Sequence, residues 1–314
     1  MSARQGGRAS MDASVIIPAH RAEATLPETL RSVEAARAAF SGESEIVVVE
    51  DPDGHGPSWA RNRGFDRARG EYVFFCDADD LARSDFLSRP VAALAESGAD
   101  LCFFGYEGGP DFPAAVDAGS DAVRARYLPA FFGYSMDDVR RWNRGGELAA
   151  HKQPGQVWRC AFRRSFLERH ALRFDERMTF FEDAAFLSAC AAFAEKALSI
   201  PDRLYVYRPR PDGNLATGWR GERNWDYKFL ALDFRRRLDE RCGGSLWRYC
   251  EASCVFSALE LLKAHYRWRE YIADGRVKEA LAAFPLSVRH PLVAAAVAFL
   301  RLAAPRARGE GKGA

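Results

Sequence analysis

The sequence predicts an α/β fold in which a mostly parallel β-sheet is flanked by helices and followed by a helical C-terminal extension. Short, β-branched apolar runs alternate with helix-like periods over the first hundred residues. Acidic or Gly/Pro-rich segments follow these runs, as expected of loops at the ends of parallel strands. Beyond about Gly218 the pattern is helical to the end of the chain.

The composition is that of a globular protein and excludes several functional classes. Of the 314 residues, 48% are hydrophobic and 28% are charged, so a wholly disordered chain is excluded. The net charge is only +2, so we expect no nucleic-acid partner. The seven cysteines form no Cys-x-x-Cys pair, and most lie in apolar runs. We therefore expect buried thiols rather than a disulfide framework.

The first predicted strand and helix lie close to the N-terminus. Residues 13–17 form a β-branched run closed by Pro18, which is typical of a buried strand that ends in a loop. Thr25 is followed three residues later by Glu28, a spacing that predicts a capping box at the start of the next helix. The apolar residues of that helix fall on one face.

A second strand and helix follow. Residues 45–49 predict a buried strand with an acidic, Gly/Pro-rich exit loop, and Ser58 is expected to cap the helix after it. Small residues recur on one face of this helix at Ala60, Gly64 and Ala68, a pattern that allows close packing on a sheet.

The later elements continue the alternation. In chain order we predict a strand at 71–76, a helix ending at Gly98, a strand at 101–104, a loop over 107–120, a helix after Glu182 and a strand at 204–207. Ligands bind at the carboxyl ends of the strands in such sheets. We therefore expect the segments 18–20, 50–51 and 77–79 to converge on one crevice.

The segment after the third strand carries three carboxylates. Asp77 and Asp79 are separated by one residue in an extended segment, so both side chains are expected on the same side. Two hard oxygen ligands suit Mg²⁺ or Mn²⁺ shared with a diphosphate. Taken alone, an acidic turn after a strand is more often an ordinary loop. We expect Asp80 to cap or anchor the next helix.

Other polar residues allow two interpretations each. Asp51 could accept hydrogen bonds from a nucleobase or ribose, or form an Asx turn in its loop. Arg61 and Arg63 could reach a phosphate, whereas a solvated surface arginine is the default. Glu182 and Asp183 lie between apolar residues, where adjacent acids are costly unless they act as caps, ion-pair partners or catalysts.

Taken in order, these blocks resemble the family 2 glycosyltransferases of the Rossmann-like GT-A fold, of the bacterial polysaccharide type. The resemblance covers about residues 12–210. The matching blocks are 14–19, Glu23, 26–33, 47–51, 60–64, 68–80, Trp158, 163–167, 172–176, 182–186 and 204–208. Each block alone is weak evidence for the family, but the occurrence of all the blocks in this order is specific to it.

The resemblance implies a role for individual residues. It implies a base and ribose pocket lined by Pro18, Ala19, Glu23 and Asp51, a nucleotide site that includes Arg61, and contacts of Asp77 and Ala78 with the ribose and diphosphate. Asp79, with Asp77, would hold Mn²⁺ or Mg²⁺. Asp183 matches the catalytic base, and Glu182 is expected to orient the acceptor or a neighbouring helix.

The chain also departs from the family pattern. His20 and Arg21 replace an aromatic-Asn pair, Glu50 replaces the first of two aspartates, and residues 52–55 replace a Gly-Ser-Thr-Asp turn. Near Cys160, a basic or polar residue often found after Trp158 is missing. The metal and base positions are intact, whereas the identity of the donor is left open.

The implied reaction is metal-dependent, inverting transfer of a sugar from a nucleotide diphosphate to a hydroxyl of a glycan or lipid-linked acceptor. A UDP-sugar is the expected donor, because Asp51 matches the acid that contacts uracil in members of the family that use UDP-sugars. One alternative is a sugar nucleotidyltransferase, but residues 18–22 lack the glycine expected of its phosphate loop. A second alternative is a non-catalytic scaffold of a polysaccharide-synthesis complex.

We expect three regions along the chain: a disordered tail at 1–10, a nucleotide-sugar and catalytic domain at 11–217, and a helical extension at 218–314. Acceptor specificity is expected in residues 107–152 and in the extension. The N-terminus lacks the apolar core of a signal peptide, so a cytoplasmic protein is expected. The apolar run 291–300 is too short to span a membrane and predicts either a packed helix or a peripheral contact with the inner face of the membrane.

Overall fold

The computed structural model describes residues 11–111, 113–132, 144, 155–178, 180–209, 224–246 and 249. The chain divides into two compact units, 1–131 with 152–221 and 132–151 with 222–314. The boundaries expected from the sequence remain a prediction, because residues 1–10 and most of 218–314 lie outside the described part. The same holds for Cys250, Cys254 and the apolar run 291–300.

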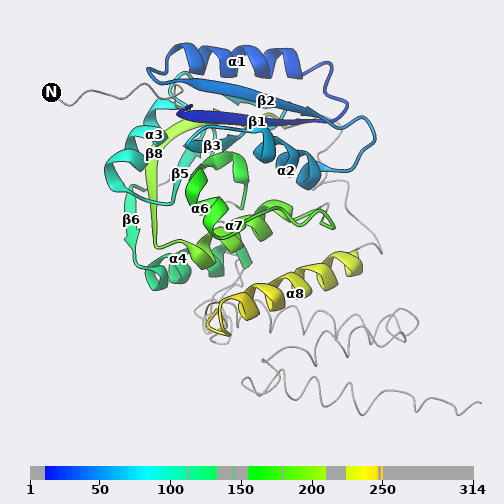
Figure 1. Cartoon of the computed structure of the whole chain (residues 1–314), viewed down its shortest axis with the longest axis vertical. Coiled ribbons are helices and arrows are strands. Elements are labelled where there is room, and N and C mark those ends of the chain that lie inside the picture. Colours follow the sequence, from blue (N-terminus) through cyan, green and yellow to red (C-terminus); the bar gives the residue numbers. More distant parts are fainter. Residues whose placement is uncertain are drawn as a thin grey trace, which may run out of the picture. The chain divides into compact units, whose positions relative to one another are not determined.

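The described part of the first unit is built around one mixed β-sheet (Figure 1). Its strands are β1 (Ala13–Ala19), β2 (Ser44–Glu50), β3 (Tyr72–Phe75), β4 (Leu81–Ala82), β5 (Leu101–Tyr106), β6 (Ala115–Ala118), β7 (Cys160–Arg163) and β8 (Lys196–Val206). They lie in the order β2-β1-β3-β7-β5-β8-β4, and β6 pairs with β8.

The sheet is mostly parallel in direction, as predicted. Strand β1 pairs in parallel with both β2 and β3, and β5 pairs in parallel with β8. Strand β7 lies antiparallel between β3 and β5, while β4 and β6 are antiparallel to β8. Five strands therefore run in the same direction: β1, β2, β3, β5 and β8. The carboxyl ends of the neighbouring strands β1, β2 and β3 lie on the same side of the sheet.

Helices cover both faces of the sheet (Figure 1). In the first unit they are α1 (Leu26–Ala38), α2 (Pro57–Arg67), α3 (Ser88–Ser97), α4 (Ser120–Phe132, whose last residue belongs to the second unit), the 3₁₀ helix η1 (Val157–Arg159), α6 (Arg164–Arg169) and α7 (Glu182–Phe193). In the second unit the described part consists mainly of α8 (Asn224–Arg241).

Side chains of β1 point alternately to the two faces of the sheet, and each face packs against its own helix. Val15 and Ile17 are fully buried in a cluster that includes Val33 of α1. Ile16 points the other way, toward Gly64 of α2, where a Cβ atom would lie 2.2 Å from the Ile16 Cγ2. Only glycine permits this approach, which confirms the close packing predicted from the small residues of this helix.

Neither predicted capping hydrogen bond is formed, because the side chains have tertiary or local partners instead. Thr25 occupies the N-cap position of α1, as predicted, but its hydroxyl donates to the Ala22 carbonyl at 3.4 Å and makes no cap. Ser58 lies inside α2, and its hydroxyl donates to the carbonyl of Met178 at 3.0 Å. Helix α2 instead begins with Pro57, whose missing N–H has no partner to lose at that position.

Two other expectations also change. The segment 107–120, predicted as a loop, contains β6 and the first residue of α4, and β8 starts well before the predicted strand 204–207. The prediction of buried thiols is confirmed for Cys76, Cys102, Cys160 and Cys190, whereas Cys242 is half-buried. Among the described residues, no helix combines the length and apolar character needed to cross a membrane.

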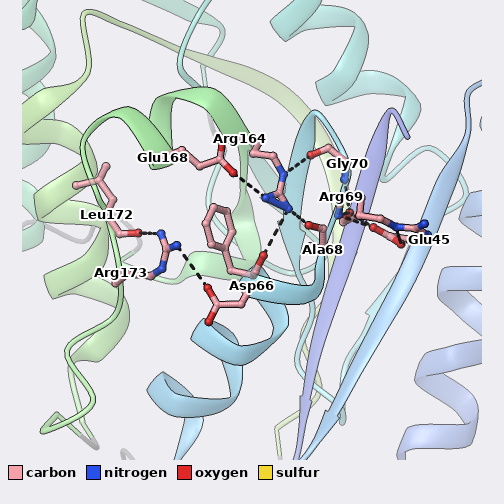
Figure 2. A network of polar contacts seen from close by, with 11 residues as sticks. Glu45, Asp66, Ala68, Arg69, Gly70, Arg164, Glu168, Leu172 and Arg173 are labelled. Atoms are coloured by element: carbon pink, nitrogen blue, oxygen red, sulfur yellow. Dashed lines mark hydrogen bonds and ion pairs between the residues drawn. The ribbon is translucent and has the colours of Figure 1, made fainter. Parts of the chain in front are cut away.

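Arg164, the first residue of α6, links this helix to the C-terminal end of α2 (Figure 2). Its guanidinium donates to the backbone carbonyls of Phe65, Ala68 and Gly70 and pairs with Glu168. It also lies 4.9 Å from the centre of the Phe65 ring. A cation at a helix C-terminus satisfies carbonyls that have no partner within the helix.

We expect Arg164→Met to lower the free energy of unfolding by about 2 kcal/mol or more, because several carbonyls lose a charged donor while the aliphatic packing is retained. Urea unfolding measures the loss. Arg169→Met is the matched control, since Arg169 is exposed on the same helix. Equal stabilities of the two variants would contradict a role of Arg164 in joining the segments.

Candidate active site

The ends of β1 and β2 meet as predicted. The Asp51 N–H donates to the carbonyl of Ala19 at 2.8 Å, and the Nδ1 atom of His20 lies 2.6 Å from the carbonyl oxygen of Asp51. Strand β3 is the other parallel neighbour of β1, so the segment 77–79 leaves the sheet at the same edge. The three segments expected to share a crevice are therefore brought together.

Asp51 is buried and organises its own loop. One carboxylate oxygen accepts the His55 N–H at 2.9 Å and lies 3.0 Å from the His55 Nδ1, while the other accepts the Gly56 N–H at 2.7 Å. Burial alone would raise the pKa of Asp51, but these hydrogen bonds outweigh it and lower the pKa. These contacts agree with the interpretation of Asp51 as a residue that orders its own loop. A contact of Asp51 with a nucleobase remains a prediction.

The other residues predicted to line the base pocket lie at or beyond the end of β1. Ala19 is buried, Pro18 is half-buried and Glu23 is exposed. These positions lie at the same end of the strand, and their roles toward a nucleotide remain predictions.

The acidic segment after β3 is anchored to β8. The hydroxyl of Tyr205 donates to the Asp80 carboxylate at 2.9 Å and accepts the Asp77 N–H at 3.0 Å. Asp80 also accepts the Arg208 N–H at 2.8 Å. Asp80 therefore anchors its segment, as predicted, but its partners are on β8 and in the residues just after β8. The predicted link to the next helix is wrong, since α3 begins only at Ser88.

Further contacts make this segment rigid. The hydroxyl of Thr29 on α1 lies 3.0 Å from the carbonyl oxygen of Ala78 and 2.8 Å from that of Asp80, and Arg208 Nε donates to the Asp79 carbonyl at 2.6 Å. Trp158 stacks on Tyr205 with ring centres 4.4 Å apart. The backbone of the predicted metal loop is thus held from α1, from β8 and from the segment that follows β8.

Glu182 and Asp183 form the first turn of α7, which confirms the helix predicted after Glu182. Acidic side chains are stabilised there by the helix dipole. The preceding residue, Phe181, has φ of 66°, in the left-handed region that non-glycine residues rarely adopt. Such strain is concentrated at functional sites, so it supports a functional role for this turn.

Arg61 joins the two acidic segments. Its Nη1 donates to Asp183 at 2.8 Å and to Glu182 at 3.1 Å, and its Nη2 donates to Asp77 at 3.0 Å. The Arg61 side chain is only 4% exposed. The default expectation of a solvated surface arginine is therefore wrong for Arg61, whereas Arg63 is exposed as expected.

Asp183 has an environment suited to proton transfer near neutral pH. Its second oxygen accepts the Val157 N–H at 3.1 Å, and its side chain is 17% exposed. Burial raises the pKa of Asp183 to about 7; Arg61 opposes this rise, and the carboxylates of Glu182 and Asp77 add to it. A carboxyl group with such a pKa can accept a proton at physiological pH.

The donor set at Asp77 and Asp79 fits a divalent cation that is shared with a ligand. Among the described residues, no group of three His, Cys, Asp or Glu side chains could hold a metal by itself. Asp77 uses only one carboxylate oxygen within that part of the chain, in its contact with Arg61, and both aspartates are half-buried. Two carboxylates of this kind leave positions for diphosphate oxygens and water.

Sequence reasoning missed several contributors to the site. The roles of Tyr205, Arg208 and the Val157 N–H depend on contacts between residues far apart in the chain. A weak signal existed for Tyr205 and Arg208, because both belong to the block 204–208 that resembles the family. Nothing in the local sequence marks a backbone N–H at Val157 as a partner of Asp183.

Comparisons with known proteins confirm the family resemblance. Residues 34–145 match the family model described as Glycosyl transferase family 2. The chain is 30% identical over 186 residues to the "Uncharacterized glycosyltransferase EpsJ" of Bacillus subtilis, covering 58% of this chain and 50% of that protein. It is 27% identical over 232 residues to the "Succinoglycan biosynthesis protein ExoO" of Rhizobium meliloti, covering 65% and 62%. The chain thus spans half to less than two thirds of these curated relatives.

Solved structures confirm the predicted fold. The crystal structure of S. aureus TarS 1–349 in complex with UDP-GlcNAc matches with a TM-score of 0.58 and 19% identity, covering 92% of this chain and 88% of that chain. The structure of TarS 1–349 without a named ligand matches with a TM-score of 0.57. At this identity the likeness establishes the α/β GT-A fold alone.

We expect Tyr205→Phe to lower the free energy of unfolding by about 1–3 kcal/mol, because the buried Asp80 carboxylate and the Asp77 N–H each lose a partner while ring packing is kept. Thermal or urea unfolding measures the change. Tyr106→Phe is the matched control, since Tyr106 is half-buried and also packs against Trp158. A Tyr205 variant as stable as this control would contradict the anchoring role.

Proposed function

We propose that this protein is a metal-dependent, inverting glycosyltransferase that moves a sugar from a UDP-sugar to an acceptor hydroxyl in the synthesis of a bacterial polysaccharide or glycoconjugate. One observation carries the proposal. The base candidate, the half-buried Asp183, is linked through Arg61 to Asp77, in the acidic segment suited to a cation-bound diphosphate. A base and a leaving-group site are the two parts that a single displacement requires.

In the proposed step, the acceptor hydroxyl oxygen forms a bond to the anomeric carbon while its proton passes to the Asp183 carboxylate. The bond between that carbon and the diphosphate oxygen breaks, and the nucleoside diphosphate leaves with the electron pair. Attack opposite the leaving group inverts the anomeric configuration. Glu182 lies beside the base on α7 and is proposed to orient the acceptor.

Asp79 and Asp77 are the residues proposed to hold Mn²⁺ or Mg²⁺. When bound, the ion would act as a Lewis acid that stabilises the negative charge developing on the diphosphate. The backbone of this segment is held by Tyr205, Thr29 and Arg208. It is therefore preorganised, and little ordering is needed when the ligand arrives.

A UDP-sugar is the proposed donor. TarS, which shares the fold, was crystallised with UDP-GlcNAc and with UDP. Pro18, Ala19, Glu23 and Asp51 would line the base and ribose pocket, and Ala78 would contact the ribose and diphosphate. The names of the relatives, among them a succinoglycan biosynthesis protein, support a polysaccharide setting.

The acceptor is proposed to be a glycan or a lipid-linked sugar bound with help from residues 107–152 and the C-terminal part of the chain. We propose a cytoplasmic protein. For residues 291–300, a peripheral contact with the inner face of the membrane is the alternative to a packed helix.

The other two functions are less well supported. A sugar nucleotidyltransferase needs a glycine-rich loop after the first strand, and the connection from β1 to α1 contains no glycine. A non-catalytic scaffold would need no base near neutral pKa, yet Asp183 has this property and is held by two partners.

We expect Asp183→Asn to lower turnover by about 100- to 10,000-fold, because the amide cannot accept the proton of the acceptor. The dissociation constant for UDP should change little. Sugar transfer and nucleotide binding are measured on the same preparation, with Asp66→Asn as a control, since Asp66 is exposed and lies outside the site. Near-normal turnover of Asp183→Asn would remove Asp183 from the role of base.

We expect UDP with Mn²⁺ to raise the melting temperature more than GDP or ADP with Mn²⁺. A ligand at about 100 times its dissociation constant stabilises the native state by about 2.7 kcal/mol. Chelation of the ion by EDTA, or Asp79→Asn, should remove most of the shift. A shift with another nucleotide but not with UDP would overturn the uridine assignment, and no shift with any nucleotide would favour the scaffold.

A further inference from the structure

The guanidinium of Arg61 is enclosed by the protein. Its two terminal nitrogens are used by three carboxylates, and its carbon lies 5.4 Å from the centre of the Phe174 ring. Its Nε is buried without a hydrogen-bond partner in the described part of the chain. Three of the four terminal N–H groups are therefore used by carboxylates of the protein itself.

The contacts of Arg61 connect segments that are distant in sequence. Arg61 belongs to α2, Asp77 follows β3, and Asp183 lies on α7, 122 residues away from Arg61. A guanidinium is planar and rigid, so donors on both terminal nitrogens fix the spacing of the groups they contact. Arg61 thus defines the distance between the base candidate and the acidic segment.

We propose that Arg61 is a positioning residue that holds Asp183 and Asp77 in one half-buried ion cluster, and thereby sets the position of the base relative to the site of the leaving diphosphate. This inference rests on the proposed glycosyl transfer for its catalytic consequence. It differs from the role implied by the family resemblance, which places Arg61 in the lining of the nucleotide site.

The charges around Asp183 explain why its ionised form depends on the Arg61 guanidinium. Among the described residues, the groups that face Asp183 are Arg61 from α2, Glu182 from its own helix, Asp77 from the end of β3, the Cys160 thiol from β7 and the Val157 N–H from η1. Without Arg61, the half-buried Asp183 would face two like charges, a neutral thiol and one backbone donor. Its ionised form, which is the form that accepts a proton, would then be disfavoured.

The first test needs no activity. Tm values are measured for the full chain, Arg61→Gln, Asp183→Asn and the double variant. We expect Arg61→Gln to lower the Tm by about 5 °C or more at pH 8, and by clearly less when Asp183 is already Asn. Losses that add would overturn the ion cluster, whether or not the protein transfers sugar.

The second test separates positioning from simple stability. We expect Arg61→Gln to lower kcat at least about 10-fold with little change in KM for the donor, and to move the acid limb of the pH–rate profile upward by about one unit. Arg61→Lys keeps the charge and should restore the acid limb and part of kcat. Should Arg61→Gln not fold, Arg61→Lys carries the test, with an intermediate kcat expected.

Arg67→Gln is the matched control, because Arg67 is exposed on the same helix. A wild-type kcat and pH profile in Arg61→Gln, or in a folded Arg61→Lys when Gln does not fold, would overturn the proposal. So would a loss confined to nucleotide affinity, since that result indicates a phosphate ligand. Absence of transfer by the unaltered protein with every donor would refute the proposed function alone, and the Tm cycle would still decide whether the cluster exists.

Discussion

The close approach of α2 to β1 is the constraint on which the site depends. Gly64 lies against Ile16 where no larger residue fits, so α2 packs directly on the sheet. Arg61 is one turn earlier on the same helix and reaches Asp77 at the end of β3, the neighbour of β1. A helix displaced by a side chain at Gly64 would carry Arg61 away from the three carboxylates.

This placement puts more negative than positive charge in a buried site. Burying ions is unfavourable unless they are paired and hydrogen-bonded, and one guanidinium cannot neutralise three carboxylates. Part of the imbalance is met by the dipole of α7, which begins at Glu182 and Asp183. The remainder appears as the raised pKa of Asp183. The same excess of negative charge makes a divalent cation near Asp77 electrostatically favourable.

Much of the sheet could be predicted from sequence, because buried parallel strands read as apolar runs and their exits as acidic loops. The convergence of Asp51 and the 77–79 segment followed from topology alone. The cap at Ser58 was mispredicted, since Ser58 donates to Met178, a partner 120 residues away that no local pattern reveals. The burial of Arg61 could not be predicted for the same reason, because it depends on partners that only the fold supplies.

Strand β8, the last strand in the sequence order, contributes a second link between the two acidic segments of the site. Tyr205 on β8 provides the hydroxyl that joins Asp80 to the Asp77 N–H, and it packs against Trp158, the neighbour of Val157. Val157 in turn donates to Asp183. The base and the acidic segment are therefore tied together twice, once through Arg61 and once through the Trp158–Tyr205 stack. Two independent links restrict the relative motion of the groups more than one does, which is the preorganisation that a proton acceptor and a leaving-group site require.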